Sequence, residues 1–249
     1  MEVIKMFKRI ISLTLTIFLS LCLATVDAAT PKFGADEAVL AYAELYTFGT
    51  SEHIAATGLP QEFADEKIKK PMQNHLMLAF KNYPLNQENF ATVQTKLIEK
   101  LHEVIKISAR IKVDDAENPV VEITANHINQ NVVDEITSHN GDFATLDVMR
   151  HISEPLELAT DGQFQNTATK AFLGLIAELP VKDATTFDVP CKLIEDNGNA
   201  YWMPQDMNAL SKFIDPTFKV KETDPKAIDD LLIAMFGGMP AGNSAKVEK

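Results

Sequence analysis

The sequence has few of the residues and motifs from which cross-linked, metal-binding or catalytic sites are usually built. It contains two cysteines, one tryptophan and six histidines in 249 residues. It contains no glycine-rich phosphate loop and no Gly-x-Ser-x-Gly nucleophile motif. The histidines, at positions 53, 75, 102, 127, 139 and 151, are never three or four residues apart, the spacing at which one helix supplies two zinc ligands. The sequence therefore names no reaction, and we expect no cofactor and no metal.

Basic residues are also scarce, which limits the class of partner. Lysine and arginine number 23 against 35 aspartates and glutamates, so the formal net charge is −12. A surface this negative repels phosphate backbones and anionic headgroups. We therefore expect no nucleic-acid binding, and membrane attachment only through the N-terminal segment.

The N-terminus has the pattern of a secretory signal peptide. Lys5, Lys8 and Arg9 precede a short apolar run over residues 10–23, and small residues follow up to Ala29. We predict a signal peptide over residues 1–28 and an exported protein, in the periplasm, at the cell surface or secreted. An uncleaved anchor is the less favoured alternative, because a membrane span needs about 20 apolar residues.

The two cysteines suggest different roles. Cys22 would carry lipid if the N-terminus were a lipoprotein signal, but Leu21 stands where that signal has a small residue. Cys191 would be the only cysteine after cleavage, so no internal disulfide is expected. Because Cys191 alternates in line with Val189 and Leu193, we interpret it as a small buried side chain rather than a nucleophile.

Two pairs of alternating segments predict β-hairpins. The predicted strands are residues 105–113 with 121–126, and residues 185–193 with 200–203. Six turn-forming residues, 114–119, join the first pair, and an Asn197-Gly198 turn joins the second. Pro190 has no backbone N–H, so we expect its strand to be an edge strand or to be bulged there.

Helical periodicity fills most of the remaining chain. The predicted helices are residues 36–48, 62–83, 87–104, 146–156, 164–179, 206–213 and one that opens at Asp224-Pro225. Gly49 should end the first, and Pro71 should kink the second. Residues 126–142, rich in asparagine, are expected to form a polar connection with a turn at Asn140-Gly141.

These elements predict an α+β protein in which an antiparallel sheet from two hairpins packs against several helices. We divide it into an α+β domain over residues 29–215, a C-terminal helix over residues 216–238 packed on that domain, and a disordered tail over residues 239–249.

Several segments resemble known families. The order of helices and hairpins, closing on Tyr201-Trp202-Met203 after the turn at residues 195–199, resembles cystatin-like and nuclear-transport-factor-like folds. Residues 34–44 and Phe48-Gly49-Thr50 resemble the start of an uncharacterised bacterial lipoprotein-like family. The resemblance covers most of residues 31–215. It implies a curved sheet around a long helix and a domain of unknown function, and it brings no catalytic residues.

Three residues are candidates for ligand binding, and none is assigned as catalytic. His127 continues the face of Val121, Ile123 and Ala125, where it is either a hydrogen-bonded core residue or a ligand on the concave side of the sheet. Trp202 either packs the last strand on a helix or forms the floor of a pocket. Asp188 is the third candidate.

A turn at residues 114–117 carries three carboxylates, Asp114, Asp115 and Glu117, that could attract calcium. It lacks the glycine and the distal glutamate of a calcium loop. We therefore interpret it as a solvated turn.

The function that these features favour is a non-enzymatic binding module of a bacterial cell envelope, which recognises an envelope protein or a small ligand. The alternative is a small-ligand enzyme with a pocket in the concave face of the sheet, using His127 or Asp188 as an acid–base group.

Overall fold

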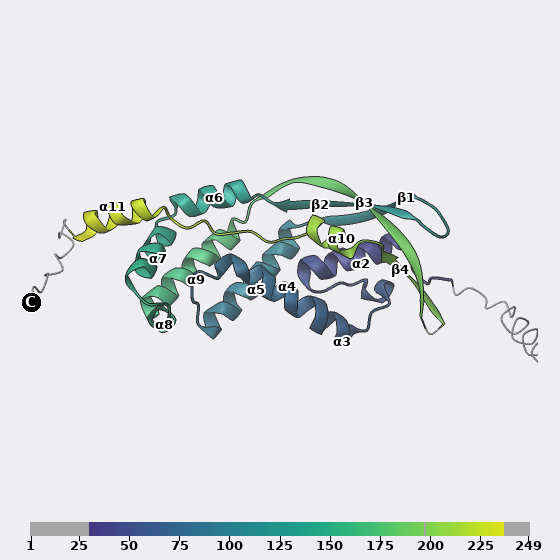
Figure 1. Ribbon diagram of the computed structural model, residues 1–249, viewed down its shortest axis with the longest axis horizontal. Coiled ribbons are helices and arrows are strands. Elements are labelled where there is room, and N and C mark those ends of the chain that lie inside the picture. Colours follow the sequence, from purple (N-terminus) through teal and green to yellow (C-terminus); the bar gives the residue numbers. More distant parts are fainter. Residues whose placement is uncertain (1–29, 197, 237–249) are drawn as a thin grey trace, which may run out of the picture.

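A computed structural model describes residues 30–196 and 198–236 of the chain. The predicted signal peptide with Cys22, and the predicted tail at residues 239–249, lie outside the described residues. The molecule is elongated, with the sheet toward one end and most of the helices toward the other (Figure 1). It is an α+β protein with one antiparallel sheet of four strands.

The chain alternates between helices and strands. The first helical part comprises α2 (Ala35–Phe48), η1 (Ile54–Thr57), α3 (Gln61–Ala64), η2 (Asp65–Lys69), α4 (Lys70–Leu76), η3 (Met77–Phe80) and α5 (Gln87–Val104). After strands β1 (Ile107–Val113) and β2 (Val120–Ile128) come α6 (Gln130–His139), α7 (Gly141–Ile152), α8 (Pro155–Leu158) and α9 (Gly162–Ala177). The last elements are β3 (Val181–Asp196), β4 (Asn199–Pro204), α10 (Met207–Phe213) and α11 (Pro225–Phe236).

The sheet has the strand order β1-β2-β3-β4, with every neighbouring pair antiparallel. Strand β3 is long and changes partner along its length: Pro190 is its last residue paired with β2, and Cys191 is its first paired with β4. Up to Pro190, β3 pairs with β2 alone, so the other side of the strand is an edge at this residue, as expected. The chain accepts the proline there because it lies where one ladder ends and the next begins.

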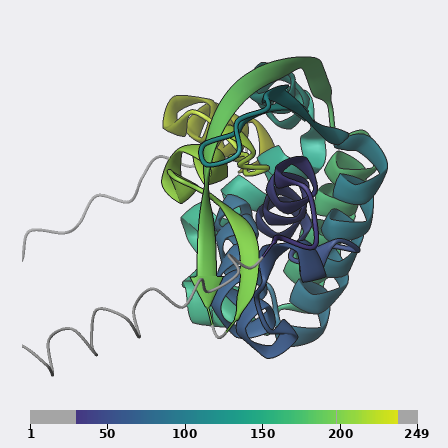
Figure 2. The same cartoon turned by 90° about the vertical axis from the view of Figure 1, so that its right-hand side faces the viewer.

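One of the two main cores lies between the sheet and α2. Helix α2 contacts β1, β2 and β4, and Figure 2 shows it enclosed between the strands and the other helices. Alternate residues of β2, namely Val121, Ile123 and Ala125, are buried on this face. Helix α2 ends as predicted at Gly49, whose φ of 73° is the left-handed conformation that glycine adopts at low cost.

The other main core joins α5, α7 and α9 with the η3 turn. Its centre is aromatic: the Phe172 ring lies 4.4 Å from Phe80, 5.2 Å from Tyr83 and 5.6 Å from Phe143 between ring centroids. Such tilted and edge-to-face pairs fill space and also align ring edges with ring faces. The two cores meet where Phe48 at the end of α2 stacks on His102 of α5.

Two helical segments differ from the sequence-based prediction. Residues 130–139, expected to be part of a polar connection, form helix α6, which buries Val133 and Thr137. The predicted helix over residues 62–83 is interrupted by a wider π-type turn at Asp65–Lys69, just before Pro71. Proline cannot donate a hydrogen bond and its ring crowds the preceding turn, so the chain widens there instead of breaking.

An extended segment, residues 214–224, connects α10 to α11 and is called the strap below. It crosses the molecule from the sheet end to the helical end (Figure 1). Phe218 and Val220 of the strap are buried in the helical core. Gln130 of α6 binds both backbone groups of Lys219, donating to its carbonyl oxygen at 2.8 Å and accepting from its N–H at 2.9 Å.

Candidate functional site

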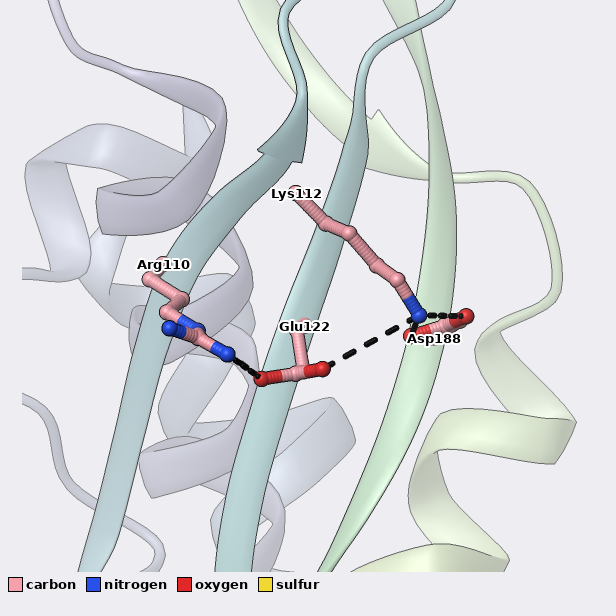
Figure 3. A network of polar contacts seen from close by, with 4 residues as sticks. All are labelled: Arg110, Lys112, Glu122 and Asp188. Carbon is pink, nitrogen blue, oxygen red and sulfur yellow. Dashed lines mark hydrogen bonds and ion pairs between the residues drawn. The ribbon is translucent and has the colours of Figure 1, made fainter.

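The three predicted ligand-binding residues do not form one site. Asp188 lies on the outer face of the sheet, because its neighbour Val189 pairs with Val121 on the inner face. Its carboxylate accepts hydrogen bonds of 2.6 and 2.8 Å from the Lys112 ammonium group. Figure 3 shows these two residues joined through Glu122 to Arg110 in a network across three strands. Asp188 therefore takes part in a solvent-exposed ion-pair network.

His127 lies on the inner side of the sheet, after a register shift in β2. Its Nε2 atom is 2.9 Å from the Thr185 hydroxyl oxygen, and its ring meets Phe213 of α10 edge-on at 5.1 Å. Partial burial, followed by the nearby charge of Lys182, lowers the pKa of this histidine from its ordinary value. The side chain therefore has polar and aromatic neighbours within the fold.

Trp202 is buried, with 9% of its surface exposed, and belongs to the core between the sheet and α2. Cys191 lies in the same core and is fully buried. Burial raises the pKa of the Cys191 thiol to about 12, which keeps it protonated near neutral pH. The interpretation of Cys191 as a small buried side chain agrees with this position.

The acidic turn after β1 is held by its own backbone. The Asp115 carboxylate accepts hydrogen bonds from the N–H groups of Glu117 and Asn118, which lower the pKa of Asp115. Within residues 30–196 and 198–236, no group of three or more His, Cys, Asp or Glu side chains is placed to hold a metal ion.

A groove lies between the strap and the helical segment α4–η3, and its first pocket has a volume of about 420 Å³. Ile68, Met72 and Leu76 form an apolar wall of the pocket, and each of these residues is almost fully buried. Lys212 of α10 and Lys67 of the π-type turn also line it. It therefore combines an apolar wall with two ammonium groups.

A second pocket of about 410 Å³ continues the groove along the strap. It shares His75 and Thr217 with the first pocket, so the two adjoin. Its lining includes Leu78, which is 53% exposed and offers an apolar surface to solvent. We call the two pockets together the strap groove.

Four exposed lysines line the strap groove, two in each pocket: Lys67 and Lys212 in the first, Lys81 and Lys219 in the second. Among the described residues, none of these four ammonium groups makes an ion pair or a side-chain hydrogen bond. Other exposed basic groups of the described residues fall into both classes: Lys96 and Lys170 form ion pairs, whereas Lys182 and Lys192 form none. The groove therefore presents uncompensated positive charge in a chain whose net charge is −12.

A polar contact crosses the groove near the residues that the two pockets share. The Nε2 atom of His75 on α4 lies 3.7 Å from the Asp215 carboxylate on the strap. Asp215 also accepts a hydrogen bond of 2.9 Å from the Thr217 N–H, which orients its carboxylate. Polar side chains therefore lie where the two pockets adjoin, and His75 lines both pockets.

Beyond the second pocket the strap is fastened by a buried carboxylate. Asp147 of α7 is 3% exposed and accepts hydrogen bonds from the Tyr83 hydroxyl at 3.0 Å, from Arg150 at 3.1 Å and from the Thr223 N–H at 2.7 Å. Burial and the adjacent Asp147 raise the pKa of Tyr83, so its hydroxyl stays protonated as the donor. The position of the strap is thus fixed by charge-assisted hydrogen bonds.

Sequence reasoning missed the strap groove because nothing local marks it. Residues 214–224 contain no regular periodicity, and their partners on α4, α6 and α7 are about 75 to 140 residues away in the chain. The only available signal was the apolar pair Phe218 and Val220 within a polar segment. His127, Asp188 and Trp202 line neither pocket of the groove.

In the described part of the chain, no helix has the length and apolar character required to cross a membrane.

Comparison with known proteins adds little to this description of the site. No protein-family model matches the sequence, and no curated protein matches it. A crystal structure of a "putative lipoprotein (ycdA)" from Bacillus subtilis superposes with a TM-score of 0.46 at 15% sequence identity. The superposition covers 74% of this chain and 56% of that chain, so this chain spans little more than half the length of the protein it matches. A likeness of this extent assigns no activity and no residue roles.

Proposed function

We propose that the protein is an extracytoplasmic, non-enzymatic binding module of a bacterial cell envelope, and that the strap groove is its binding site. The observation that carries the proposal is the coincidence of exposed apolar surface with unpaired positive charge in one depression. Binding sites commonly combine apolar walls with a few placed polar groups. The extracytoplasmic location rests on the signal-peptide pattern of residues 1–28.

The proposal includes a cystatin-like arrangement of the sheet end, built from two hairpins that wrap α2. Its support is the antiparallel pairing of β1 with β2 and of β3 with β4, and the contact of α2 with three of the four strands. It also includes the division into residues 29–215 and a C-terminal part over residues 216–238 packed on them. Burial of Phe218, Val220 and Ile228 supports that division.

The enzyme alternative draws no comparable support. It requires His127 or Asp188 to reach a pocket as an acid–base group. These two residues lie on opposite faces of the sheet, and the Asp188 carboxylate is held by Lys112. They are therefore not arranged to act on one ligand.

Site-specific photo-crosslinking in intact envelopes of the source organism tests the proposed site. A photoreactive phenylalanine replaces Leu78 in the groove, and a matched variant carries it at Val113 on β1, which has a similar exposure of 48%. We expect a discrete adduct from position 78 and none from position 113. Adducts from position 113 alone would move the binding site to the sheet and contradict the proposal.

A further inference from the structure

The shape of the strap groove restricts what it can hold. Two pockets of similar volume, about 420 and 410 Å³, adjoin, each is lined by both apolar and polar side chains, and His75 and Asp215 lie near the point where they adjoin. A single alkyl chain needs a continuous apolar trough, because placing methylene groups against polar side chains removes those groups from water without compensation. A polypeptide can instead place a peptide group beside His75 and Asp215 and one apolar side chain in each pocket.

The charge of the groove restricts the ligand further. The two lysines of the first pocket lie on opposite walls, Lys67 on the helical side and Lys212 on the α10 side, and Lys81 and Lys219 repeat this arrangement in the second. The acidic groups that line the groove are Asp215, which lies 3.7 Å from His75, and Glu222, which contacts Asn82 and Arg150. The four lysines outnumber these two carboxylates, so the formal charge of the lining is positive and complements an acidic ligand.

The strap also sets an approximate spacing. The strap residues that line the first pocket are 215–217, and those that line the second are 217–220 and 222, so the centres of the two sets lie about three strap residues apart. A ligand that runs extended beside the strap would have the same rise per residue. Its two apolar anchors should then be separated by about three or four positions.

We infer that the strap groove binds an extended acidic peptide segment of another protein, through two apolar anchor side chains flanked by carboxylates. This inference rests on the proposed function, since it specifies the ligand of the same groove. The lysines supply attraction and orientation, and the two pockets supply the apolar contacts that select the segment. The His75–Asp215 pair enforces the gap between the anchors.

Fluorescence anisotropy with defined peptides tests the inference on the purified protein. The probe is a labelled twelve-residue peptide of Asp, Glu and Ser that carries Leu and Phe four positions apart. One control peptide replaces the acidic residues by lysine, a second replaces both anchors by serine, and dodecanoate serves as a single-chain anionic amphiphile. The double variant Lys67→Glu/Lys212→Glu reverses charge in the first pocket, and Lys182→Glu/Lys192→Glu makes the same change at exposed positions of β3.

We expect the acidic two-anchor peptide to bind, the two control peptides not to bind, and affinity to fall with rising salt. The groove variant should weaken binding about tenfold or more, and the β3 variant about twofold or less. The lysines replaced in the two variants are exposed and have no ion-pair or side-chain hydrogen-bond partner among the described residues. Both variants should therefore fold, and circular dichroism checks this.

Three results would overturn the inference. One is equal binding of the acidic and lysine peptides, and another is equal weakening by the groove and β3 variants. The third is binding of dodecanoate, but of no peptide, in a way that the groove variant abolishes. If the position-78 adduct still forms in any of these cases, the groove remains a binding site and only its ligand class is wrong. If no adduct forms either, the proposed function fails as well.

Discussion

Two aspartates show how differently the same side chain behaves in this fold. Asp147 is almost fully buried and accepts three hydrogen bonds from three separate segments. Asp188 is exposed and meets only the flexible ammonium group of Lys112, whose pKa is raised mainly by that hydrogen bond. Buried charge-assisted bonds contribute much more to stability than exposed pairs, which are weakened by solvent and salt.

Replacing Asp188 should therefore have little effect on stability. We expect Asp188→Asn to change the free energy of unfolding by less than about 1 kcal/mol, the usual range for an exposed ion pair. Urea denaturation checks this value. A loss of several kcal/mol would mean that the network of Figure 3 is a cooperative unit rather than a set of surface pairs.

Trp202 should be important for stability, because its ring fills the core between the sheet and α2. We expect Trp202→Ala to cost about 3–5 kcal/mol, as large aromatic truncations in a core usually do. Thermal or urea denaturation measures the loss. A variant that melts within a degree or two of the parent would place the ring outside the core and return it to the list of binding residues.

His127 should titrate below its ordinary pKa. Burial disfavours its charged form, so the folded state binds a proton less readily than the unfolded chain. Its contribution to stability is then complete above the unfolded pKa near 6.5 and is lost as the pH falls through the folded pKa. Titration by NMR should show the lowered pKa, and the acid-side loss should be smaller in His127→Gln. An unchanged acid-side loss in that variant would assign it to other groups.

If the enzyme alternative held, His127→Gln would also lower turnover of a small ligand about 100-fold, as loss of a general base does. On the proposed function, this variant folds and binds the same partner as the parent protein.

Among the elements, the strap is the one whose position depends on single side chains. It has no regular hydrogen-bonding pattern of its own, and Gln130 and Asp147 hold it through its backbone. The strap wall of the strap groove therefore depends on contacts made outside the groove.

Removing the Asp147 charge should loosen the strap. Asp147→Asn keeps the shape of the side chain but weakens the bonds to Arg150 and Thr223, at a cost of about 1.5–3 kcal/mol. Hydrogen exchange followed by mass spectrometry should show faster exchange in residues 217–224. Asp188→Asn serves as the matched control. Unchanged exchange in the strap would show that burial of Phe218 and Val220 alone fixes it.

The sequence allowed most of the regular elements to be predicted, because their signals are local. The helix predicted over residues 87–104 is confirmed as α5, where the Asn86 side chain accepts a 2.9 Å bond from the Asn89 N–H, and the end of α2 at Gly49 is confirmed as well. Helix α6 was missed because the asparagines of residues 126–142 outweighed the helical spacing of Val133 and Ile136. The strap groove could not be predicted, since its walls come together only through distant contacts.

At the scale of the whole molecule, the lysines of the strap groove carry charge opposite in sign to the net charge of the chain. The chain is strongly acidic, yet its strap groove carries lysines without partners among the described residues. A local field of opposite sign attracts acidic ligands without making the rest of the surface adhesive.

The location of the whole protein rests on its N-terminus, where we expect cleavage before Ala29. Intact-mass measurement of the protein from the extracytoplasmic fraction should give a chain that begins at this residue. A chain that begins at a lipid-modified Cys22 would instead make the protein a lipoprotein.

The contact of α2 with β4 has a consequence for the order in which the molecule is made. Residues 35–48 of α2 contact residues 199–204 of β4. The strap, whose residues Phe218 and Val220 complete the helical core, lies still later in the chain. During synthesis neither core can be completed until most of the chain has left the ribosome. Folds dominated by such distant contacts form slowly, since a long loop must close before the contacts repay it. If the predicted signal peptide directs export, slow closure of these distant contacts would favour passage of the chain across the membrane before it folds.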